Sequence, residues 1–467
     1  MLKFLFLLGP LLGYSNPFPQ EYMIDKDDEF TKNFFSLSKV YQSQAMGLPV
    51  LRVQTKWTRN SETKKENFEL IGVTRENSGT LFMAQSKIQR PTLGSYIGVL
   101  NCGGRKLYDA IGTGSAFRKL TPAMSFRFPI NKDVKGVCYF DLVAENPVSG
   151  NMEVVLKRKL NSSKVRSLKK RKVEVALIKR SIKSKKLYVN IYAEGYKESR
   201  RDIFFQRAKK VVEKLQSISL PGFEYLEFNA VFAHSERKLG KAKVLESGKI
   251  PKINSFLGLY FPYWAKEVVK RWYHIIYPTN DTQFRDGLAQ APYDYPIVLV
   301  DDAQYWGIGN YKLMTAIPAE SSKFSYLLYH ELGHFFGLNE EYDGGGPTEL
   351  QFAPEIVKPW SQNLTFSSKE DGSINRDNLK WVNLLHSNAK SLPTSQFFWR
   401  ANYERGKAWP VGVYAGGYAD SEPRRRSFIP VKMGVCIMHS GSKFCPVCSK
   451  GIQDVIGFDL GFLHRHH

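Results

Sequence analysis

The sequence predicts an α+β protein in which an N-terminal β-sandwich-like domain is followed by a mixed α/β domain. The chain has 467 residues, which is too long for one typical hydrophobic core. Residues 50–160 consist of short β-branched and aromatic runs separated by turn residues, whereas residues 187–467 mix helical apolar stripes with buried strands. Residues 161–186 are strongly basic and separate the strand-rich segment from the mixed α/β segment, so we interpret them as a linker.

The beginning of the chain has the composition of an export signal. "MLKFLFLLGPLLGYSN" contains Lys3, an apolar run over residues 4–12, and small residues suited to cleavage before Asn16. We expect a signal peptide over residues 1–15 and an N-terminal extension over residues 16–49. An uncleaved anchor is the weaker alternative, because a membrane span needs about 20 apolar residues. The sequence therefore predicts a secreted or periplasmic protein with no transmembrane segment.

The segment from 50 to 160 predicts an all-β sandwich. β-branched and aromatic residues alternate partially with polar ones in four stretches, "SYIGVLNCG", "MSFRFPI", "GVCYFDLVAE" and "MEVVLKRKL". Turn signals such as "NPVSGN" fall between them. Cys102 and Cys138 lie in this segment. Because disulfides form in exported chains, these two cysteines are candidates for a pair.

The formal net charge is +23, and two basic runs, at 164–186 and 422–427, carry much of it. A surface of this kind attracts anionic partners such as cell walls, lipopolysaccharide or nucleic acid. No nucleic-acid-binding motif accompanies the charge. We therefore favour a solvated basic face, with binding to anionic surface polymers as the alternative.

The segment after 187 reads as alternating strands and helices. "LYVNIYAEGY" predicts a strand ending in a glycine turn, and "RRDIFFQRAKKVVEKLQSI" predicts an amphipathic helix. "YLEFNAVFAH" predicts a second strand, "PYWAKEVVKRWYHII" a helix and "YPIVLVDD" a buried strand. The apolar stripe of the first helix consists of Phe204, Ala208, Val211, Val212 and Leu215.

A further helix carries the most informative motif of the chain. "SSKFSYLLYHELGHFFGL" offers Ser321 or Ser322 as the N-cap, contains no proline and ends before Gly337. His330 and His334 are four residues apart, so both imidazoles leave the same face of the helix.

The HExxH spacing is that of a zinc site. Two histidines at this spacing can bind one tetrahedral zinc ion, and Glu331 lies beside them. The alternative is a pair of core histidines on an ordinary amphipathic helix. The residues that follow favour zinc: Gly337 can turn the chain under the metal, and Glu340 follows three residues later as a third ligand, with Glu341 as its neighbour.

Two features near the C-terminus bear on this site. Met438, in "GVCIMHSGSKFCPVC", could form a tight methionine turn beneath the metal, although a single methionine is more often core packing. The same stretch holds Cys436, Cys445 and Cys448. Cys436 could pair with either of the others, leaving one cysteine over. "FCPVC" alone would also suit zinc or redox chemistry, but no second CxxC accompanies it.

With these motifs the chain resembles the bacterial IgA peptidase family of zinc metallopeptidases, a metzincin-like group. The resemblance covers roughly residues 187–456 and includes "VNIYAEGY", "FNAVFAHSE", the Cys-x-Met of residues 436–438 and "FCPVC". The chain departs from the family pattern in having Glu340 where aspartate is favoured, and Ser440 where some metzincins have tyrosine. The residues that match the family's zinc helix are His330, Glu331, His334, Gly337, Glu340, Glu341 and Tyr342.

The resemblance implies a zincin/metzincin-like catalytic domain that hydrolyses peptide bonds. It implies that His330, His334 and Glu340 hold Zn²⁺ and that Glu331 is the general base for a zinc-bound water. Tyr342 or a backbone donor would support the oxyanion.

In metzincins the strand before the zinc helix lies at the upper edge of the cleft and pairs with an extended substrate. The residues that we expect there to contact a protein or peptide substrate are Tyr305, Trp306, Gly307 and Gly309. A plain surface loop is the alternative for them. A hypothesis of another class is an exported adhesin or cell-wall-binding protein with a vestigial metal site.

Overall fold

The computed structural model describes sixteen segments of the chain. The signal peptide expected at 1–15, nearly all of the extension at 16–49, most of the helix expected at 262–276 and all of the run at 422–427 except Ser427 lie outside the described residues. The described residues are 49–59, 66–76, 96–102, 105–111, 123–130, 137–145, 152–161, 164–236, 241–242, 254–262, 276–278, 280–342, 362–367, 373–404, 409–417 and 427–460.

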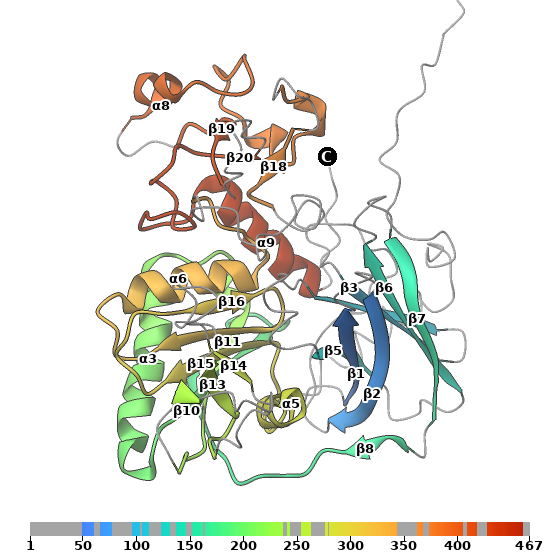
Figure 1. The fold of residues 1–467 in the computed structure, drawn as a ribbon. Coiled ribbons are helices and arrows are strands. Elements are labelled where there is room, and N and C mark those ends of the chain that lie inside the picture. The colour runs from blue at the N-terminus through green and yellow to red at the C-terminus, as the bar shows by residue number, and fades with distance from the viewer. Residues whose placement is uncertain are drawn as a thin grey trace, which may run out of the picture.

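The N-terminal β region, residues 50–160, contains seven of the eight strands of two four-stranded sheets (Figure 1), and the eighth, β8 (Arg166–Ser167), follows it in the chain. One sheet has the order β5-β1-β2-β8 and the other the order β4-β3-β6-β7, and all pairings are antiparallel except that of β2 with β8. The bounds are β1 Val50–Arg59, β2 Glu66–Glu76, β3 Tyr96–Cys102, β4 Arg105–Ile111, β5 Ala123–Pro129, β6 Cys138–Glu145 and β7 Met152–Leu160.

Both sheets contribute to one apolar core. Phe126 of β5 and Phe140 of β6 are fully buried and contact each other with ring centroids 5.7 Å apart. Cys102 and Cys138 lie opposite each other on β3 and β6 and form a disulfide. The predicted pairing of these two cysteines is confirmed.

The basic segment 161–186 is more than a linker. It contributes β8 (Arg166–Ser167) to the first sheet of the β region and β9 (Glu174–Lys179) to the sheet of the α/β region that follows. Several of its cations are engaged internally: Arg166 pairs with Asp286 at 2.8 Å, and Lys186 pairs with Glu227 at 2.7 Å. The sequence pattern missed these strands because they are short and lie within a lysine-rich segment.

The α/β region is organised around a six-stranded sheet with the order β16-β17-β15-β10-β11-β9. The four inner strands are parallel, whereas the two terminal strands, β16 and β9, run antiparallel to their neighbours. The bounds are β10 Leu187–Glu194, β11 Leu226–Phe232, β15 Tyr295–Val300, β16 Ile308–Asn310 and β17 Met314–Pro318.

Alternating strand residues build an apolar layer on each face of this sheet. Ile191 of β10 and Ile297 of β15 pack with helices α3 (Arg201–Ser217) and α6 (Phe324–Phe335) in one layer. Tyr192 and Val298 point into the other layer, which includes α5 (Asp281–Leu288). The five residues predicted for the apolar stripe of the first helix are the buried residues of α3.

The C-terminal part adds short strands and two helices. A small sheet has the order β18-β20-β19, and α9 runs beside the α/β region in red (Figure 1). Asp459, at the end of α9, accepts a hydrogen bond from Tyr295 at 2.8 Å and pairs with Lys312 at 2.7 Å. The remaining bounds are η3 Glu198–Arg200, η4 Phe223–Tyr225, β12 Lys241–Ala242, β13 Leu259–Pro262, β14 Tyr277–Pro278, β18 Thr365–Phe366, η6 Arg376–Asn378, η7 Val382–Leu384, α8 Gln396–Asn402, β19 Tyr414–Ala415, β20 Ser427–Ile429 and α9 Pro446–Asp459.

A buried ion network joins the β region to the α/β region. Glu76 of β2 is fully buried between Arg52, at 3.2 Å, and Arg127, at 2.9 Å. Arg52 also binds Asp286 of α5. Arg127 donates to the carbonyl oxygen of Tyr293 at 2.8 Å and lies over its ring. Since buried charges need such partners, this network fixes how the two regions meet.

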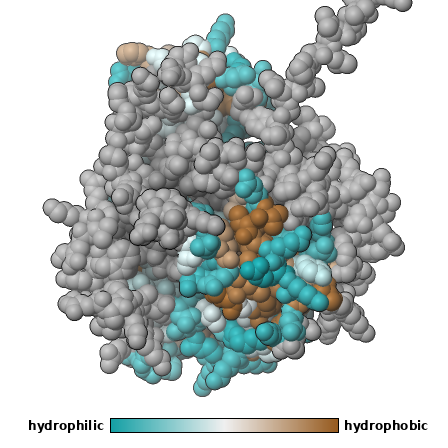
Figure 2. All heavy atoms as spheres, turned by 45° about the vertical axis from the view of Figure 1, so that its right-hand side comes forward, coloured by the Kyte–Doolittle hydropathy of each residue, from teal (hydrophilic) through white to brown (hydrophobic). Residues whose placement is uncertain are grey.

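Figure 2, which brings the side of the β region forward, shows apolar side chains between rows of hydrophilic ones. Among the described residues of the β region, the exposed large apolar side chains are Ile71, Val137, Tyr139 and Val154. None of the helices in the described ranges is long and apolar enough to cross a membrane.

Candidate metal centre

Helix α6 carries the histidine pair and lies on the sheet beside β16 and β17. It begins at Phe324 with Lys323 at the N-cap and no side-chain cap, so the predicted cap at Ser321 or Ser322 is wrong. Instead, the Ser321 hydroxyl accepts from the Lys323 N–H in a turn that precedes the helix. Most of the helix is buried, because it is apolar on nearly all sides.

The helix ends in a Schellman motif at Gly337. The N–H of Leu338 donates to the carbonyl of Gly333 at 3.0 Å, and the N–H of Gly337 donates to that of His334 at 2.9 Å. Gly337 has a φ of 81°, a left-handed conformation that glycine adopts without strain. The motif turns the chain back toward His334, as the sequence predicts.

The two histidines present their Nε2 atoms to one point. His330 Nδ1 lies 3.1 Å from the carbonyl oxygen of Ile437, and His334 Nδ1 lies 2.8 Å from that of Leu338. Each carbonyl oxygen accepts a hydrogen bond from the Nδ1–H group, which leaves the Nε2 lone pair available to ligate a metal. The two Nε2 atoms are 3.1 Å apart. Two Zn–N bonds of about 2.0–2.1 Å at a tetrahedral angle would place them roughly 3.3 Å apart.

Burial keeps His330 neutral. Its pKa is lowered to about 3, first by burial and then by the neighbouring His334. A neutral imidazole is the form that binds a metal. Two aromatic rings enclose it: Tyr326 stacks on one side at a centroid distance of 5.3 Å and Tyr342 lies at 5.8 Å. Sequence reasoning missed Tyr326, which lies four residues before His330 on the same helix face.

The third donor of this group is Glu340. Its Oε1 lies 3.7 Å from His334 Nε2, and it forms a group with His330 and His334 whose ligand atoms all lie within 4.8 Å of one another. Tyr342 donates its hydroxyl hydrogen to Glu340 Oε1 at 3.1 Å, which orients the carboxylate. Glu341 points elsewhere, toward Asn363 and Cys448. The geometry therefore favours Glu340 over Glu341 as the third donor to this group.

Glu331 is buried against the glycine segment before β17. The backbone N–H of Gly309 donates to its carboxylate. A Cβ on Gly307 would lie 2.4 Å from Glu331 Oε1, and a Cβ on Gly309 would lie 1.9 Å from the Glu331 carbonyl oxygen. The pKa of Glu331 is raised to about 8, mainly by burial and next by the charge of Glu340. A carboxylate with a raised pKa is poised to accept a proton near neutral pH.

The four residues expected along the substrate edge separate into three environments. Tyr305 is 57% exposed, and Glu331 contributes to raising its pKa after burial. Trp306 is buried in the core and donates its indole N–H to Asp302 at 2.6 Å, so its ring does not line a surface rim. Gly307 and Gly309 contact Glu331, with Gly309 in β16 at the edge of the sheet.

Met438 lies directly beneath the histidine helix. It is fully buried, and a Cβ on Gly333 would lie 2.4 Å from its sulfur. The next residue, His439, was not singled out from the sequence, although it accepts a hydrogen bond from the Tyr326 hydroxyl through its carbonyl at 3.0 Å. Its ring faces Tyr342 at a centroid distance of 6.2 Å.

The donor set of two imidazoles and one carboxylate is one that catalytic zinc uses, with a fourth position left for water. Residues 175–408 match the model of the IgA peptidase M64 family. The chain belongs to this family of peptidases. The match includes α6 and Glu340 but ends before Met438 and the C-terminal cysteines, whereas the resemblance expected from the sequence extends to residue 456. No curated protein matches the chain significantly.

Proposed function

We propose that this peptidase is an exported zinc-dependent endopeptidase in which Glu331 is the general base. The observation that carries the proposal is the convergence of His330 Nε2, His334 Nε2 and Glu340 Oε1. Both Nδ1 atoms are held by carbonyl oxygens, so the donors are oriented before any metal binds. Substrates are proteins or peptides, as membership of a peptidase family requires.

A zinc ion bound by these three residues would acidify a water molecule and polarise the scissile carbonyl. Glu331 takes the proton of that water on its carboxylate and then transfers it to the leaving amine. The Gly309 N–H holds the carboxylate in place during both transfers. Because Glu331 is buried, its charge is poorly solvated, and gaining the proton is favourable.

Two tyrosines near the site have different proposed roles, orientation of the third ligand and donation to the substrate. Tyr342 is engaged with Glu340, so we assign it to orientation of the third ligand. Tyr305 is exposed and lies close enough to Glu331 for the charge of that carboxylate to raise the pKa of Tyr305, after the effect of burial. We assign its hydroxyl to the substrate side of the site, where it can donate to the carbonyl oxygen as negative charge develops.

The sheet edge at β16 is suited to hold an extended peptide. β16 is the terminal strand of the six-stranded sheet and pairs with β17 on one side. An added strand on its other side would form main-chain hydrogen bonds along Ile308–Asn310, next to Glu331.

We interpret the two-sheet β region as a β-sandwich-like domain and residues 187–467 as the metzincin-like catalytic domain. The shared core of the two sheets supports the first interpretation. The helix–Gly337–Glu340 segment and Met438 below it support the second. The Cys102–Cys138 disulfide supports secretion or a periplasmic location, since such bonds persist in oxidising compartments.

The proposal is tested by cleavage profiling of the purified full-length protein on a peptide library. Cleavage is expected with zinc, abolished by a chelator and restored by zinc. The His334→Ala variant should not be restored by zinc, since it lacks one ligand. Cleavage that persists after complete metal removal would contradict a metal-dependent mechanism.

A further inference from the structure

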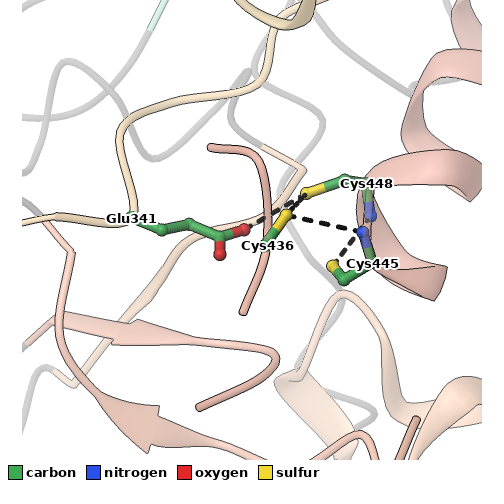
Figure 3. A group of neighbouring side chains, drawn as sticks. All are labelled: Glu341, Cys436, Cys445 and Cys448. Carbon is green, nitrogen blue, oxygen red and sulfur yellow. Dashed lines mark hydrogen bonds between the residues drawn. The ribbon is translucent and has the colours of Figure 1, made fainter. Parts of the chain in front are cut away.

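Four buried side chains outside the candidate active site form a second group of metal-ligand type. They are Glu341, Cys436, Cys445 and Cys448, and their ligand atoms all lie within 4.8 Å of one another. Figure 3 shows the Glu341 carboxylate pointing toward the sulfur atoms. Three segments meet here: the chain after α6, the turn before Met438 and the start of α9.

The distances fit a metal better than a disulfide. Cys436 Sγ and Cys448 Sγ are 3.6 Å apart, and Cys448 Sγ lies 3.2 Å from Glu341 Oε1. Zn–S bonds of about 2.3 Å at a tetrahedral angle place two sulfurs roughly 3.8 Å apart, whereas a disulfide bond is about 2.05 Å long. All three cysteines are free thiols, so the expected pairing of Cys436 with Cys445 or Cys448 is not formed.

Two backbone N–H groups favour negative charge on the sulfurs of Cys436 and Cys445. The N–H of Cys445 points to Cys436 Sγ and the N–H of Cys448 points to Cys445 Sγ, each at 3.4 Å. Cys448 lies in the first turn of α9, where the positive end of the helix dipole stabilises thiolates. Two thiolates from a CxxC at the start of a helix, joined by a third from a distant turn, form a common arrangement in structural zinc sites.

Glu341 supplies an independent indication of a bound cation. Its side chain is 1% exposed, and its Oε2 atom has no hydrogen-bond partner among the described residues. Oε1 accepts from Asn363 Nδ2 at 3.0 Å. A buried carboxylate oxygen without a donor is strongly unfavourable unless a cation binds it.

We propose that Cys436, Cys445, Cys448 and Glu341 bind a structural zinc ion, separate from the histidine site. Three thiolates select a soft or borderline metal, and four protein ligands leave no open position for water. The ion would join Glu341, the neighbour of Glu340, to Cys436, which lies two residues before Met438. It would therefore hold both the third ligand and the methionine turn of the histidine site in position.

The experiment measures zinc per chain by elemental analysis of the full-length protein, purified with reductant and dialysed against zinc-free buffer. About two zinc ions are expected in the wild type, one in the His330→Ala/His334→Ala variant and one in Cys445→Ser. Ser449→Ala, next to Cys448 but without a ligand atom in the group, is the matched control and should keep both. One zinc in the wild type and none in the histidine variant would overturn the proposal.

The same measurements separate this proposal from the proposed catalytic zinc. A single zinc that survives the histidine substitutions and is lost in Cys445→Ser would support the thiolate site and contradict the catalytic one. If Cys445→Ser does not fold, cobalt loading of the His330→Ala/His334→Ala variant gives the answer. A thiolate-to-cobalt charge-transfer band is expected there. Its absence, or a Cys436–Cys448 disulfide found by mass spectrometry in the native protein, would overturn the proposal.

Discussion

The backbone N–H of Glu341 donates a hydrogen bond to the carbonyl oxygen of Met438, with a nitrogen–oxygen distance of 3.0 Å. This bond connects the segment that presents Glu340 to the turn beneath the histidine helix, although nearly 100 residues separate the two in sequence. Met438 in turn packs its sulfur against Gly333, between the two histidines. The helix, the third donor and the methionine turn are therefore one packed unit.

The contact between Gly333 and Met438 predicts non-additive stability effects. Met438→Ala should lower the free energy of unfolding by about 2–5 kcal/mol, because it leaves a cavity in a fully buried site. Gly333→Ala alone should also destabilise, because its methyl group would lie 2.4 Å from the Met438 sulfur. In the double variant the new methyl group occupies vacated space, so urea unfolding should show less destabilisation than the sum. Simple additivity would mean that the two residues do not contact each other.

The division of roles between Glu340 and Glu341 predicts opposite metal phenotypes. Glu340→Ala should lower the zinc affinity of the histidine site by more than ~10–100-fold, which is the loss typical when a residue that hydrogen-bonds to a metal ligand is substituted. Tyr342→Phe, which removes only the hydrogen bond to Glu340, should stay within that range. Glu341→Ala should leave zinc at the histidine site. Competition titration with a chelator measures all three, and a reversed order for Glu340 and Glu341 would reassign the third ligand.

The close approach of Gly307 to Glu331 predicts a catalytic defect without metal loss. Gly307→Ala places a methyl group 2.4 Å from Glu331 Oε1 and must displace the carboxylate. We expect kcat to fall by up to about 10²-fold, since a shift of about 1 Å in a catalytic group has this effect. Gly72→Ala is the control, because its Cβ would meet only Gln54 Oε1, at 3.9 Å. An unchanged kcat in Gly307→Ala would show that the glycine does not position Glu331.

The buried network at Glu76 predicts a large effect on stability far from the site. Glu76→Ala leaves Arg52 and Arg127 without their shared carboxylate, and we expect a loss of about 3–5 kcal/mol in urea unfolding. Glu69 lies on the same strand and pairs with Lys56 at 3.5 Å, but both side chains are exposed. Glu69→Ala should therefore change stability by at most about 1 kcal/mol. Equal effects of the two substitutions would argue against a stabilising network between the regions.

The sequence predicted those features that depend on residues close together in the chain. The apolar stripe of α3, the histidine helix and the Gly337 turn follow from spacings of three and four residues. The Cys102–Cys138 pair was expected because both cysteines lie in one strand-rich segment.

Features that depend on three-dimensional contacts between distant segments were missed. Gly307 and Gly309 were expected at the substrate edge, which stays a prediction, but their close approach to Glu331 was not foreseen because it depends on how β16 meets α6. Trp306 was expected at the rim, but its side chain is buried in the core, where the indole N–H donates a hydrogen bond to Asp302. Zinc at "FCPVC" was considered from the sequence and set aside because no second CxxC accompanies it. The group's carboxylate, Glu341, lies about 100 residues before the cysteines, and sequence spacing carries no signal over that separation.

The central claim, that Glu331 is the general base of a zinc-bound water, is tested most directly by the turnover of Glu331→Gln. Glutamine keeps nearly the same shape but cannot take the proton. With zinc content at the wild-type level, the turnover of a cleaved peptide should fall by at least about 10²-fold, within the 10²–10⁴ range of general-base catalysis. Unchanged turnover in zinc-replete Glu331→Gln would contradict the mechanism, and full biological activity without peptide cleavage would favour a binding protein with a vestigial site.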